Sequence, residues 1–352
     1  MVEVPGLAVI VVNYRTPYDA VKCIRAIFGE NIAVPGLEVM LVDNASGDNS
    51  LNIMADELSD LVSSEFVTLV PLHLNGGFGW ANNQAILMLF ERDSPPEFIM
   101  MLNPDCTIEP NAILNLRNHL LANQKCAAVG SQLLNVDGSL AGSAFRFPSI
   151  GREFVRGAGV ALIGQALGVA PILVMSDERC EVDWVTGASC LLRTSTLVNC
   201  GLFDDGFFLY FEEVELMFRL RKAGWTIWHD PNSRVFHVGG ASTGLGEGKS
   251  PLKKTFPLYW FESRRRFFTR AYGPLQAWFA GIAWISGAFL RRVVSVAQPI
   301  KSDPSDFGNM RQMVAHGLRA DRNDRCDCVV KLGDPLGNRP AWMSMAENNT
   351  SV

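Results

Sequence analysis

The chain has 352 residues, of which 48% are hydrophobic, and a formal net charge of -5. A chain of this length buries a large core and exceeds the usual size of one domain, so we expect one large domain with appendages. The acidic balance argues against nucleic acid as a partner. The eight cysteines lie mostly in apolar segments, which favours reduced thiols over a disulfide framework. Because the N-terminus lacks a charged region followed by a long apolar core, we expect a cytoplasmic protein.

Four segments in the first third of the chain combine a short apolar run with a helical pattern behind it. The apolar runs cover residues 7–14, 38–42, 67–72 and 98–102. The first helix has an N-cap and a first-turn proline at Thr16 and Pro17. Parallel strands that are covered by helices on both faces are apolar along their whole length, as these are. We therefore predict an α/β fold with a mostly parallel central sheet.

Polar side chains follow three of these predicted strands. They are Asn13 and Tyr14, Asp43 and Asn44, and Asn103 and Asp105. In open α/β sheets the carboxyl ends of the strands form the rim where ligands bind. A strand-end or helix-cap role explains any one of these residues as well as ligand binding does, but it does not readily explain all of them together. The chain has no glycine-rich dinucleotide motif after the first strand and no P-loop sequence.

Asp105 and His237 are the candidate metal ligands of this rim. An aspartate that projects from the end of a buried strand is placed to hold a hard divalent cation, which in turn bridges phosphate oxygens. His237 ends another apolar run far downstream. A single histidine in that position is also explained by simple packing.

Three glutamates open a predicted helix that runs to Lys222. At about 100° per residue, Glu212 and Glu215 share one side with Arg219, which we expect to be solvated, while Glu213 faces the body of the protein. A carboxylate that faces inward costs free energy unless it is paired, hydrogen-bonded or wetted by a cleft, so Glu213 is the candidate catalytic base. The alternative is a solvated helix start, in which the acids face the helix dipole and Glu215 pairs with Arg219.

Eight short motifs follow one another in a single order along the chain. They are Val11-Val12-Asn13-Tyr14, Val42-Asp43-Asn44-Ala45-Ser46, the segment Asn75 to Asn83, Leu102-Asn103-Pro104-Asp105, Trp184-Val185-Thr186-Gly187-Ala188, Gly201-Leu202-Phe203-Asp204, the segment Phe208 to Leu216, and His237-Val238-Gly239-Gly240. Each motif alone is degenerate, but their order is specific. Over about residues 7 to 245 the chain resembles the family-2 glycosyltransferases, in particular the subgroup that includes bacterial rhamnosyltransferases.

The resemblance implies a GT-A fold and an inverting transfer of a sugar from a nucleoside diphosphate sugar, dTDP-rhamnose being favoured, to an acceptor hydroxyl. It also implies roles for individual residues of this sequence. Tyr14 lies against the nucleobase, Asp43 accepts a hydrogen bond from it, Asn44, Asn83 and Asn103 complete the nucleotide site, Asp105 and His237 hold Mg²⁺ or Mn²⁺, Glu213 is the base, and Trp184 and Gly187 line the acceptor side. Residues 135–182 are expected to shape that side as well.

The chemistry asks for the same residue types. A cation stabilises the charge that builds on a leaving diphosphate, so the leaving group needs no general acid, and one carboxylate suffices to deprotonate the acceptor. The family usually carries Glu-Asp-x-Asp at this helix start, whereas this chain has Glu212-Glu213-Val214-Glu215. Three interpretations remain open: Glu213 is the base, Glu212 replaces it, or activity is reduced.

The segment from Lys249 to Lys301 contains ten basic residues and a single acid, Glu262. Within it, Leu275 to Leu290 is apolar and flanked by arginines. Sixteen residues of helix span only about 24 Å, which is short for a bilayer. We therefore expect peripheral attachment to the cytoplasmic face of the inner membrane, with a glycan or lipid-linked glycan as acceptor. The alternative is a packing helix whose arginines contact the donor pyrophosphate or solvent.

The predicted organisation has three parts. Residues 1–245 form the catalytic domain, with a nucleotide-binding half at 1–134 and an acceptor half at 135–245. Residues 246–301 form a helical membrane-associating extension, and residues 302–352 form a polar, loosely ordered tail. Two other function classes remain: a nucleotidyltransferase, which should carry a basic glycine-rich loop that Leu7 to Thr16 lacks, and a nucleotide-sugar-binding protein with little or no transferase activity.

Overall fold

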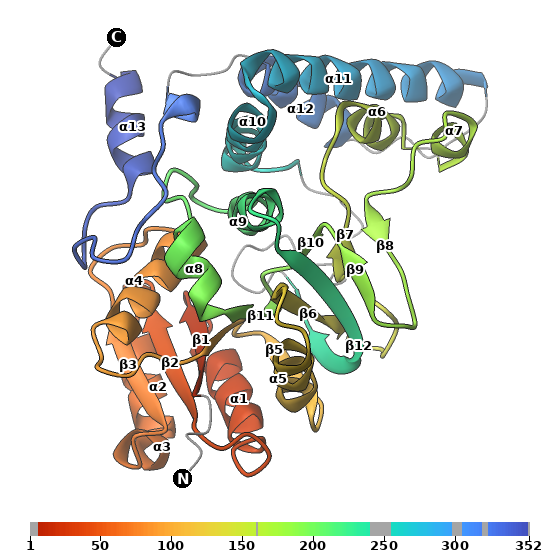
Figure 1. Ribbon diagram of the computed structural model, residues 1–352. Helices are drawn as coiled ribbons and strands as arrows, with labels where there is room; N and C mark the ends of the chain where they lie inside the picture. The colour runs from red at the N-terminus through yellow and green to blue at the C-terminus, as the bar shows by residue number, and fades with distance from the viewer. Residues whose placement is uncertain (1–5, 160, 240–254, 298–304, 319–322, 351–352) are drawn as a thin grey trace.

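The computed structural model describes residues 6–159, 161–239, 255–297, 305–318 and 323–350 (Figure 1). The strands are β1 (Leu7–Asn13), β2 (Leu37–Asp43), β3 (Val67–Pro71), β4 (Phe98–Leu102), β5 (Cys106–Ile108), β6 (Cys126–Leu134), β7 (Ala144–Phe145), β8 (Leu173–Val174), β9 (Cys180–Val182), β10 (Trp184–Val185), β11 (Ser189–Arg193) and β12 (Thr226–His237). The α-helices are α1 (Pro17–Phe28), α2 (Ser50–Glu57), α3 (Ser59–Ser63), α4 (Phe78–Phe90), α5 (Ala112–Ala122), α6 (Ile150–Ala158), α7 (Ala161–Ala166), α8 (Thr194–Cys200), α9 (Glu212–Lys222), α10 (Leu258–Tyr272), α11 (Pro274–Ala297), α12 (Ser305–Gln312) and α13 (Ala341–Thr350).

The central sheet has the strand order β3-β2-β1-β4-β11-β6-β12-β5, with β9 paired to β12. The first four strands of that order are mutually parallel, as the apolar runs predict. Strand β11 is antiparallel to both β4 and β6, and β12 is parallel to β6 but antiparallel to β5. The nucleotide-binding half is therefore a parallel sheet, and the second half is mixed. Strands β10, β7 and β8 form a separate small sheet.

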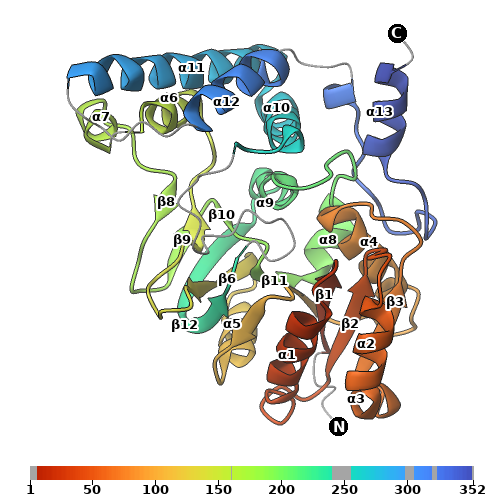
Figure 2. The ribbon, with the colours of Figure 1, turned by 180° about the vertical axis from the view of Figure 1, so that it is seen from behind.

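Helices cover both faces of the parallel half. Alternate residues of β1 point to opposite faces: Leu7, Val9 and Val11 pack with α1, α2, α3 and α5, while Ala8, Ile10 and Val12 pack with α4, α8 and α9. Figure 2 brings α1, α2 and α5 to the viewer's side of the sheet. Every residue of β1 is buried, which explains why its sequence is apolar without alternation.

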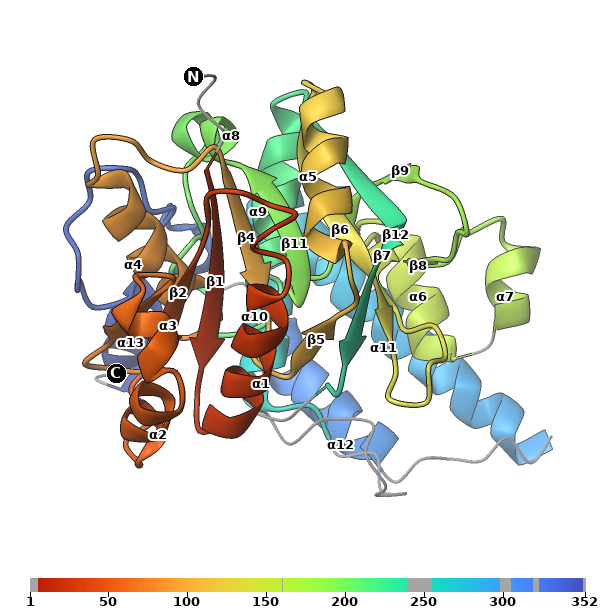
Figure 3. The same ribbon diagram turned by 90° about the horizontal axis from the view of Figure 1, so that it is seen from below.

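A layer of helices made of α6, α7, α10, α11 and α12 lies beyond α9, at the top of Figure 1. Helices α6 and α11 cross with their backbones in contact, and two glycines allow this close approach. A side chain on Gly157 would collide with the Trp284 carbonyl, and one on Gly287 would collide with the Phe154 carbonyl. Figure 3 shows α6 and α7 toward the β12 end of the sheet and α13 toward the β2 end. Helix α11 has 24 residues, eight more than the apolar run predicts, so its length no longer argues against a membrane span.

The arginines of α10 do not face a lipid surface, contrary to the expectation that flanking arginines hold anionic lipid. Arg264 pairs with buried Glu153 at 2.6 Å, Arg265 pairs with Asp324 at 2.6 Å, and Arg266 pairs with Asp204 at 2.7 Å. These pairs form because Arg264 and Arg266 are buried and Arg265 is only 12% exposed, and a guanidinium withdrawn from water needs an acid as its partner. They tie α10 to α6, to the C-terminal segment and to the loop before α9.

The C-terminal segment differs from the loosely ordered tail that its composition predicts. Residues 328–330 pair with the loop after α8, since Leu202 N donates to Val330 O at 2.8 Å and Asp205 N donates to Cys328 O at 3.1 Å. Indole and amide groups of the core then bind the backbone at residues 337–338. Backbone hydrogen bonds do not require an apolar sequence, so composition missed them. The proposed boundary at 245–246 and Gly240 of the last motif lie outside the described residues.

Candidate active site

The polar residues that follow β1, β2, β3 and β4 lie at one rim of the sheet, because these strands are parallel. The register pairs Asn13 directly with Asp43. Asn13 Nδ2 donates to Asp43 Oδ1 at 2.9 Å, and Ser46 donates to the same carboxylate from its hydroxyl at 2.6 Å and from its backbone N at 3.2 Å. Three bonds thus fix the orientation of the Asp43 carboxylate and leave it room to accept a further hydrogen bond. Tyr14 is half-buried beside it, with the Arg15 guanidinium 5.1 Å from its ring centroid.

The loop after β3 is shaped by Asn44. Its amide donates to Asn75 Oδ1 at 3.0 Å and to Gly77 O at 3.4 Å, and it accepts from Gly76 N at 3.3 Å. Asn44 is almost fully buried, so its side chain serves to fix this loop. Gly77 has a φ of +92° and lies so close to the Phe208 carbonyl that no side chain fits, which explains the glycine.

Asn83 is not available to hold a nucleotide, contrary to the role that the resemblance implies. Its side chain is fully buried, its Nδ2 donates to Phe203 O at 2.9 Å, and its Oδ1 accepts from Phe203 N at 3.0 Å. The Asn83 amide thus satisfies both backbone groups of Phe203, as a neighbouring strand would, in the loop that leads to α9. Asn83 is a structural link between α4 and that loop.

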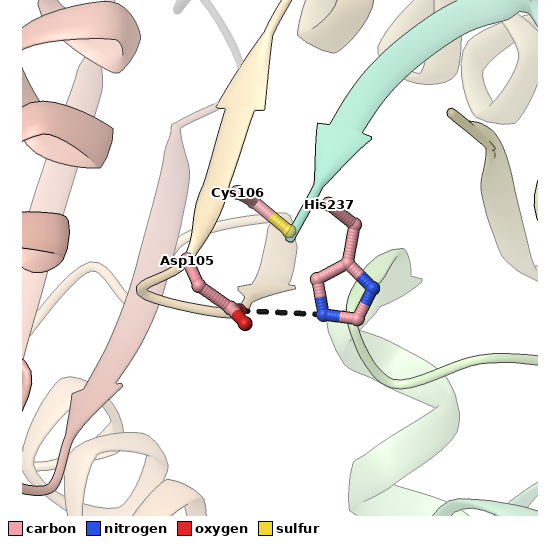
Figure 4. A group of neighbouring side chains, drawn as sticks. All are labelled: Asp105, Cys106 and His237. Atoms are coloured by element: carbon pink, nitrogen blue, oxygen red, sulfur yellow. Dashed lines mark ion pairs between the residues drawn. The ribbon is translucent and has the colours of Figure 1, made fainter. Parts of the chain in front are cut away.

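Asp105 and His237 meet beside the rim, as Figure 4 shows. Asp105 lies in the tight turn that joins β4 to β5, and His237 ends β12, whose last residue pairs with Cys106 of β5. His237 Nε2 is 3.3 Å from Asp105 Oδ1 and 3.3 Å from the Asn103 side-chain amide. The pairing of β5 with β12 therefore brings together residues that are far apart in sequence.

This donor set fits a hard divalent cation. A carboxylate oxygen and an imidazole nitrogen offer lone pairs to the same space, and the His237 side chain is 20% exposed, which leaves that space accessible. The third nearby group, the Cys106 thiol, is unsuited as a ligand, because burial raises its pKa well above the ordinary value and its sulfur donates to Ala188 O at 3.5 Å. A second acidic cluster, Asp204 with Asp205 and Cys328, already has arginine partners.

One short segment links the Asp105 region to the glutamates of α9. Asn103 N donates to Ala188 O at 2.9 Å. A side chain on the preceding Gly187 would lie 3.3 Å from the Phe78 ring and 3.7 Å from Glu213 Cβ. Asn103, Ala188, Gly187 and Glu213 therefore follow one another in space. The turn that carries Asp105, a candidate metal ligand, is joined through Ala188 and Gly187 to the candidate base.

Glu213 and Glu212 are both held in surroundings that favour the protonated carboxyl. Burial raises the pKa of Glu213 to about 7. Burial and the neighbouring Glu213 raise the pKa of Glu212 well above its usual range. Within the described part of the chain, Oε2 of each residue is buried without a hydrogen-bond partner. A carboxyl whose pKa lies near neutrality can act as a general base at physiological pH.

The expectation that Glu212, Glu215 and Arg219 form a solvated side of this helix is wrong. Glu212 and Glu215 are each only 3% exposed. Glu215 does pair with Arg219 at 2.8 Å, as predicted, but Arg219 also donates to the backbone carbonyls of Gly201 and Leu202. The reason is that α9 packs on both sides: Leu216 and its neighbours join the sheet core, and Val214 joins the aromatic cluster of α10.

An apolar pocket of about 540 Å³ opens beside Glu213. Its walls come from α6, from residues 169–173, from β10 and from the turn into α9. Its aromatic lining is Phe145, Trp184, Tyr210, Phe211 and Trp260. Trp184 stacks on Phe145 with ring centroids 4.2 Å apart and donates from its indole to Arg146 O at 3.1 Å. Glu213 is the acidic member of the lining, and Arg152 and Arg156 of α6 are its basic members.

Sequence reasoning missed three contributors to this site. Ser46 lies within a quoted motif but received no role, although its hydroxyl orients Asp43. Trp260 and Tyr210 line the pocket from elements whose packing no local pattern reveals. Tyr210 and Phe211 both have positive φ, 69° and 68°, which a bulky side chain rarely adopts. No sequence signal for that conformation exists here, because neither residue is glycine or asparagine.

Comparisons with known proteins agree with this geometry. The family described as "Glycosyltransferase like family 2" matches residues 5–268. An N-acetylglucosaminyl-diphospho-decaprenol L-rhamnosyltransferase of Mycobacterium tuberculosis is 30% identical over 220 residues, which are 59% of this chain and 68% of that protein. The rhamnosyltransferase WbbL of Escherichia coli is 25% identical over 166 residues, covering 46% of this chain and 60% of that protein.

The fold is also found among solved structures. The mannosyltransferase PcManGT of Pyrobaculum calidifontis, solved in complex with GDP-Man and Mn²⁺, matches with a TM-score of 0.53 and 15% identity, covering 89% of this chain and 81% of that one. At that identity the likeness establishes the GT-A fold alone. Since the family match spans most of the chain and includes the rim, the Asp105–His237 pair and α9, this protein belongs to glycosyltransferase family 2.

Proposed function

We propose that this protein is an inverting glycosyltransferase that moves a sugar from a nucleoside diphosphate sugar to a hydroxyl of a lipid-linked glycan in the synthesis of a cell-surface polysaccharide. Rhamnose from dTDP-rhamnose is the favoured donor, because the relatives from M. tuberculosis and E. coli are named rhamnosyltransferases. The observation that carries the proposal is the carboxyl of Glu213, poised near neutrality in the wall of a pocket and joined through Gly187 and Ala188 to the Asp105 turn.

The donor belongs at the rim of the parallel strands. Tyr14 offers a ring face for a nucleobase, and the remaining lone pair on the Asp43 carboxylate accepts a ring N–H of a pyrimidine base. The loop at Gly76 and Gly77, fixed by Asn44, lets backbone approach the nucleotide closely. Asn103 holds the metal-ligand turn in place through His237 and Ala188.

Asp105 and His237 would hold the Mg²⁺ or Mn²⁺ that a diphosphate donor brings with it. When bound, the ion supplies charge neutralisation to the departing diphosphate. Since the leaving group then needs no proton, the protein has to manage the acceptor proton alone. That requirement matches the carboxyl of Glu213 in the pocket lining, whose pKa is near neutrality.

Glu213 performs that step. As the acceptor oxygen forms its bond to the anomeric carbon, its proton passes to the Glu213 carboxylate, and the bond between that carbon and the diphosphate oxygen breaks. Attack from the side opposite the diphosphate inverts the anomeric centre. Burial and the neighbouring Glu213 carboxyl raise the pKa of Glu212 and so favour its protonated form beside Glu213. The additional methylene of a glutamate places its carboxyl farther from α9 than an aspartate would.

The acceptor belongs in the aromatic pocket. Trp184, Tyr210 and Trp260 offer apolar faces to a sugar ring, and Arg152 and Arg156 put positive charge on the wall nearest the helical layer. Gly187 leaves the space between Phe78 and Glu213 open for the attacking hydroxyl. A glycan joined to lipid through diphosphate would match both features of the pocket. Its sugar has an apolar face for the aromatic rings, and its diphosphate is an anion for the arginines.

Helix α11 supports attachment to a membrane surface. Its span from Pro274 to Val294 is long and apolar enough to cross a bilayer by length and composition, and only 22% of its most apolar window is buried. Leu275, Trp278, Phe279, Phe289 and Val293 are exposed along it. Because the opposite side of α11 packs on α6 through Gly157 and Gly287, we favour a helix that lies on the membrane over one that crosses it.

The proposal is tested with a panel of nucleotide sugars on the purified protein, with Mn²⁺, with Mg²⁺ and with chelator. We expect one donor, dTDP-rhamnose first, to raise the melting temperature in a metal-dependent way, because a ligand that binds the native state stabilises it. The same donor, labelled in the sugar, should then transfer label to a polyprenyl-diphosphate glycan. Stabilisation without transfer to any lipid-linked acceptor would favour a binding protein instead.

A further inference from the structure

The segment at residues 328–342, here called the C-terminal strap, lies outside the family match at residues 5–268 but contacts both sides of the candidate active site. On the donor side it contacts helix α4 and the loop before it. The Trp80 indole donates to Asn338 O at 2.8 Å, Gly337 N donates to Gln84 Oε1 at 2.7 Å, and the Trp342 indole donates to Gly76 O at 2.8 Å. Gly76 belongs to the loop that Asn44 shapes.

The strap also holds the loop that leads into α9. Val330 exchanges backbone hydrogen bonds with Leu202 and Phe203, and Trp342 N donates to Asp205 O at 3.2 Å. The Trp342 ring lies 4.8 Å from the Phe208 ring, and Phe208 in turn lies 5.3 Å from Tyr259. Trp342 therefore contacts both the Gly76 loop and the Phe208 turn, through two different groups of one side chain.

The two parts that Trp342 joins also touch each other directly. Phe78 N donates to Phe208 O at 3.2 Å, next to the position where Gly77 leaves no room for a side chain. Two residues after Phe208 come Tyr210 and Phe211, whose left-handed conformations cost free energy and persist only where the surroundings impose them. Glu212 and Glu213 follow at once. Glu213 thus directly follows a strained turn, and the Trp342 ring packs against Phe208 at the start of that turn.

We propose that Trp342 is a positioning residue for sugar transfer: it clamps the Phe208–Phe211 turn to the Gly76 loop and so sets the carboxyl of Glu213 against the donor. This inference rests on the proposed function. The indole N–H fixes the donor loop, and the ring fixes the turn, so the two contributions separate in variants. A loosened turn also admits water around Glu213, whose pKa is raised by burial.

The test compares Trp342→Ala with Trp342→Phe, which keeps a ring against Phe208 but loses the bond to Gly76. In Trp342→Ala we expect kcat to fall on the order of tenfold to a hundredfold, the scale for a displacement of about 1 Å. The rising limb of the pH–rate profile should move to lower pH, which a merely structural role would not cause. Trp342→Phe should recover part of kcat and restore the profile.

Leu336→Ala, which truncates a 39% exposed side chain of the same strap, is the control and should change kcat less than twofold. Hydrogen exchange supplies a readout without turnover: the amides of residues 75–79 and 206–213 should exchange faster in Trp342→Ala, while those of α5 stay unchanged. Unchanged exchange at both segments, or an unchanged kcat and pH profile, would overturn the role of Trp342. A wild-type protein that transfers no sugar would instead overturn the proposed function.

Discussion

The rim at the strand ends and the aromatic pocket beside Glu213 are built differently. The rim consists of polar side chains on turns that follow four neighbouring parallel strands, and hydrogen bonds between neighbouring turns, such as Asn13 to Asp43, orient several of them. The pocket is apolar and aromatic, and its walls come from α6, β10, the turn into α9 and α10. A rim of that kind keeps its shape through its strands, whereas the pocket keeps its shape only while separate elements stay packed.

This difference predicts where a substitution acts. Changes at the rim should alter donor and metal affinity, and changes at the pocket should alter acceptor use. A change at Glu213 should affect the chemical step that joins them. The following experiments test that division, beginning with the largest expected effect.

Replacing Glu213 with glutamine should stop transfer while donor binding persists. Glutamine keeps the volume of the side chain but cannot accept the acceptor proton, and a general base contributes about 10² to 10⁴ in rate. We expect a fall in kcat of that size, measured with labelled nucleotide sugar, and an unchanged thermal shift by the donor. Glu212→Gln is the matched control, because burial and the neighbouring Glu213 raise the pKa of Glu212 and favour its neutral form, and it should retain transfer within a few-fold. Near-normal turnover by Glu213→Gln would remove that residue from the role, and loss in Glu212→Gln alone would transfer the role to Glu212.

Replacing Asp105 with asparagine should weaken metal-dependent donor binding. The substitution removes the negative charge from the pair with His237 but keeps the shape of the turn between β4 and β5. We expect transfer to fall roughly 10- to 100-fold and the donor's thermal shift to lose its dependence on Mn²⁺. Asp137→Asn changes an exposed aspartate away from the rim and should leave both unchanged. A variant at Asp105 that keeps full metal dependence would show that the cation binds elsewhere.

Polar substitutions on α11 should weaken binding to anionic vesicles without changing the chemical step. Trp278→Gln with Phe289→Gln removes two exposed rings from its apolar side, each contributing on the order of 1 kcal/mol or more when buried in lipid. We therefore expect binding to vesicles, measured by sedimentation, to weaken by at least about thirtyfold, with unchanged transfer to a short water-soluble acceptor. Ile32→Gln, at a fully exposed residue outside the helical layer, is the control. Equal sedimentation of all three proteins would contradict the membrane role of α11.

The same difference explains what the sequence could predict. The apolar runs identify β1 to β4 closely, since a strand buried on both faces must be apolar throughout, and the residues at their carboxyl ends then fall on one rim. Helical phase predicts an inward Glu213 and a solvated Glu212, whereas the structure buries Glu212 more deeply than Glu213, which lines the pocket. Phase describes one helix and cannot say that α9 is covered on both sides.

The sequence could not predict the pocket or the C-terminal strap for a related reason. Trp260 and Trp342 reach the site across long stretches of chain through packing and backbone bonds, for which a single sequence carries no spacing rule. Arg264 to Arg266 look like a basic surface in sequence, yet their partners Glu153, Asp324 and Asp204 come from three other parts of the chain. Charge counted along a segment thus says little about which charges stay exposed.

The dependence on pH joins rate to stability through one carboxyl. Because the pKa of Glu213 is raised to about 7 and the base must be deprotonated, the transfer rate should rise with pH below about 7, by up to tenfold per unit, and level off above it. A rate that is flat between pH 5.5 and 8 would contradict Glu213 as the titrating base.

The stability of the protein should change in the opposite direction over the same range. A carboxyl whose folded pKa is raised favours the folded state in its protonated form, so this stabilisation is complete below the ordinary value of about 4.5 and is lost as pH rises through about 7. Glu213→Gln stays neutral throughout and should lose none of it. We therefore expect the free energy of unfolding, measured in urea from pH 5 to pH 8, to fall in the wild type relative to this variant by on the order of 1–3 kcal/mol. Parallel curves would contradict the burial that raises the pKa of the Glu213 carboxyl.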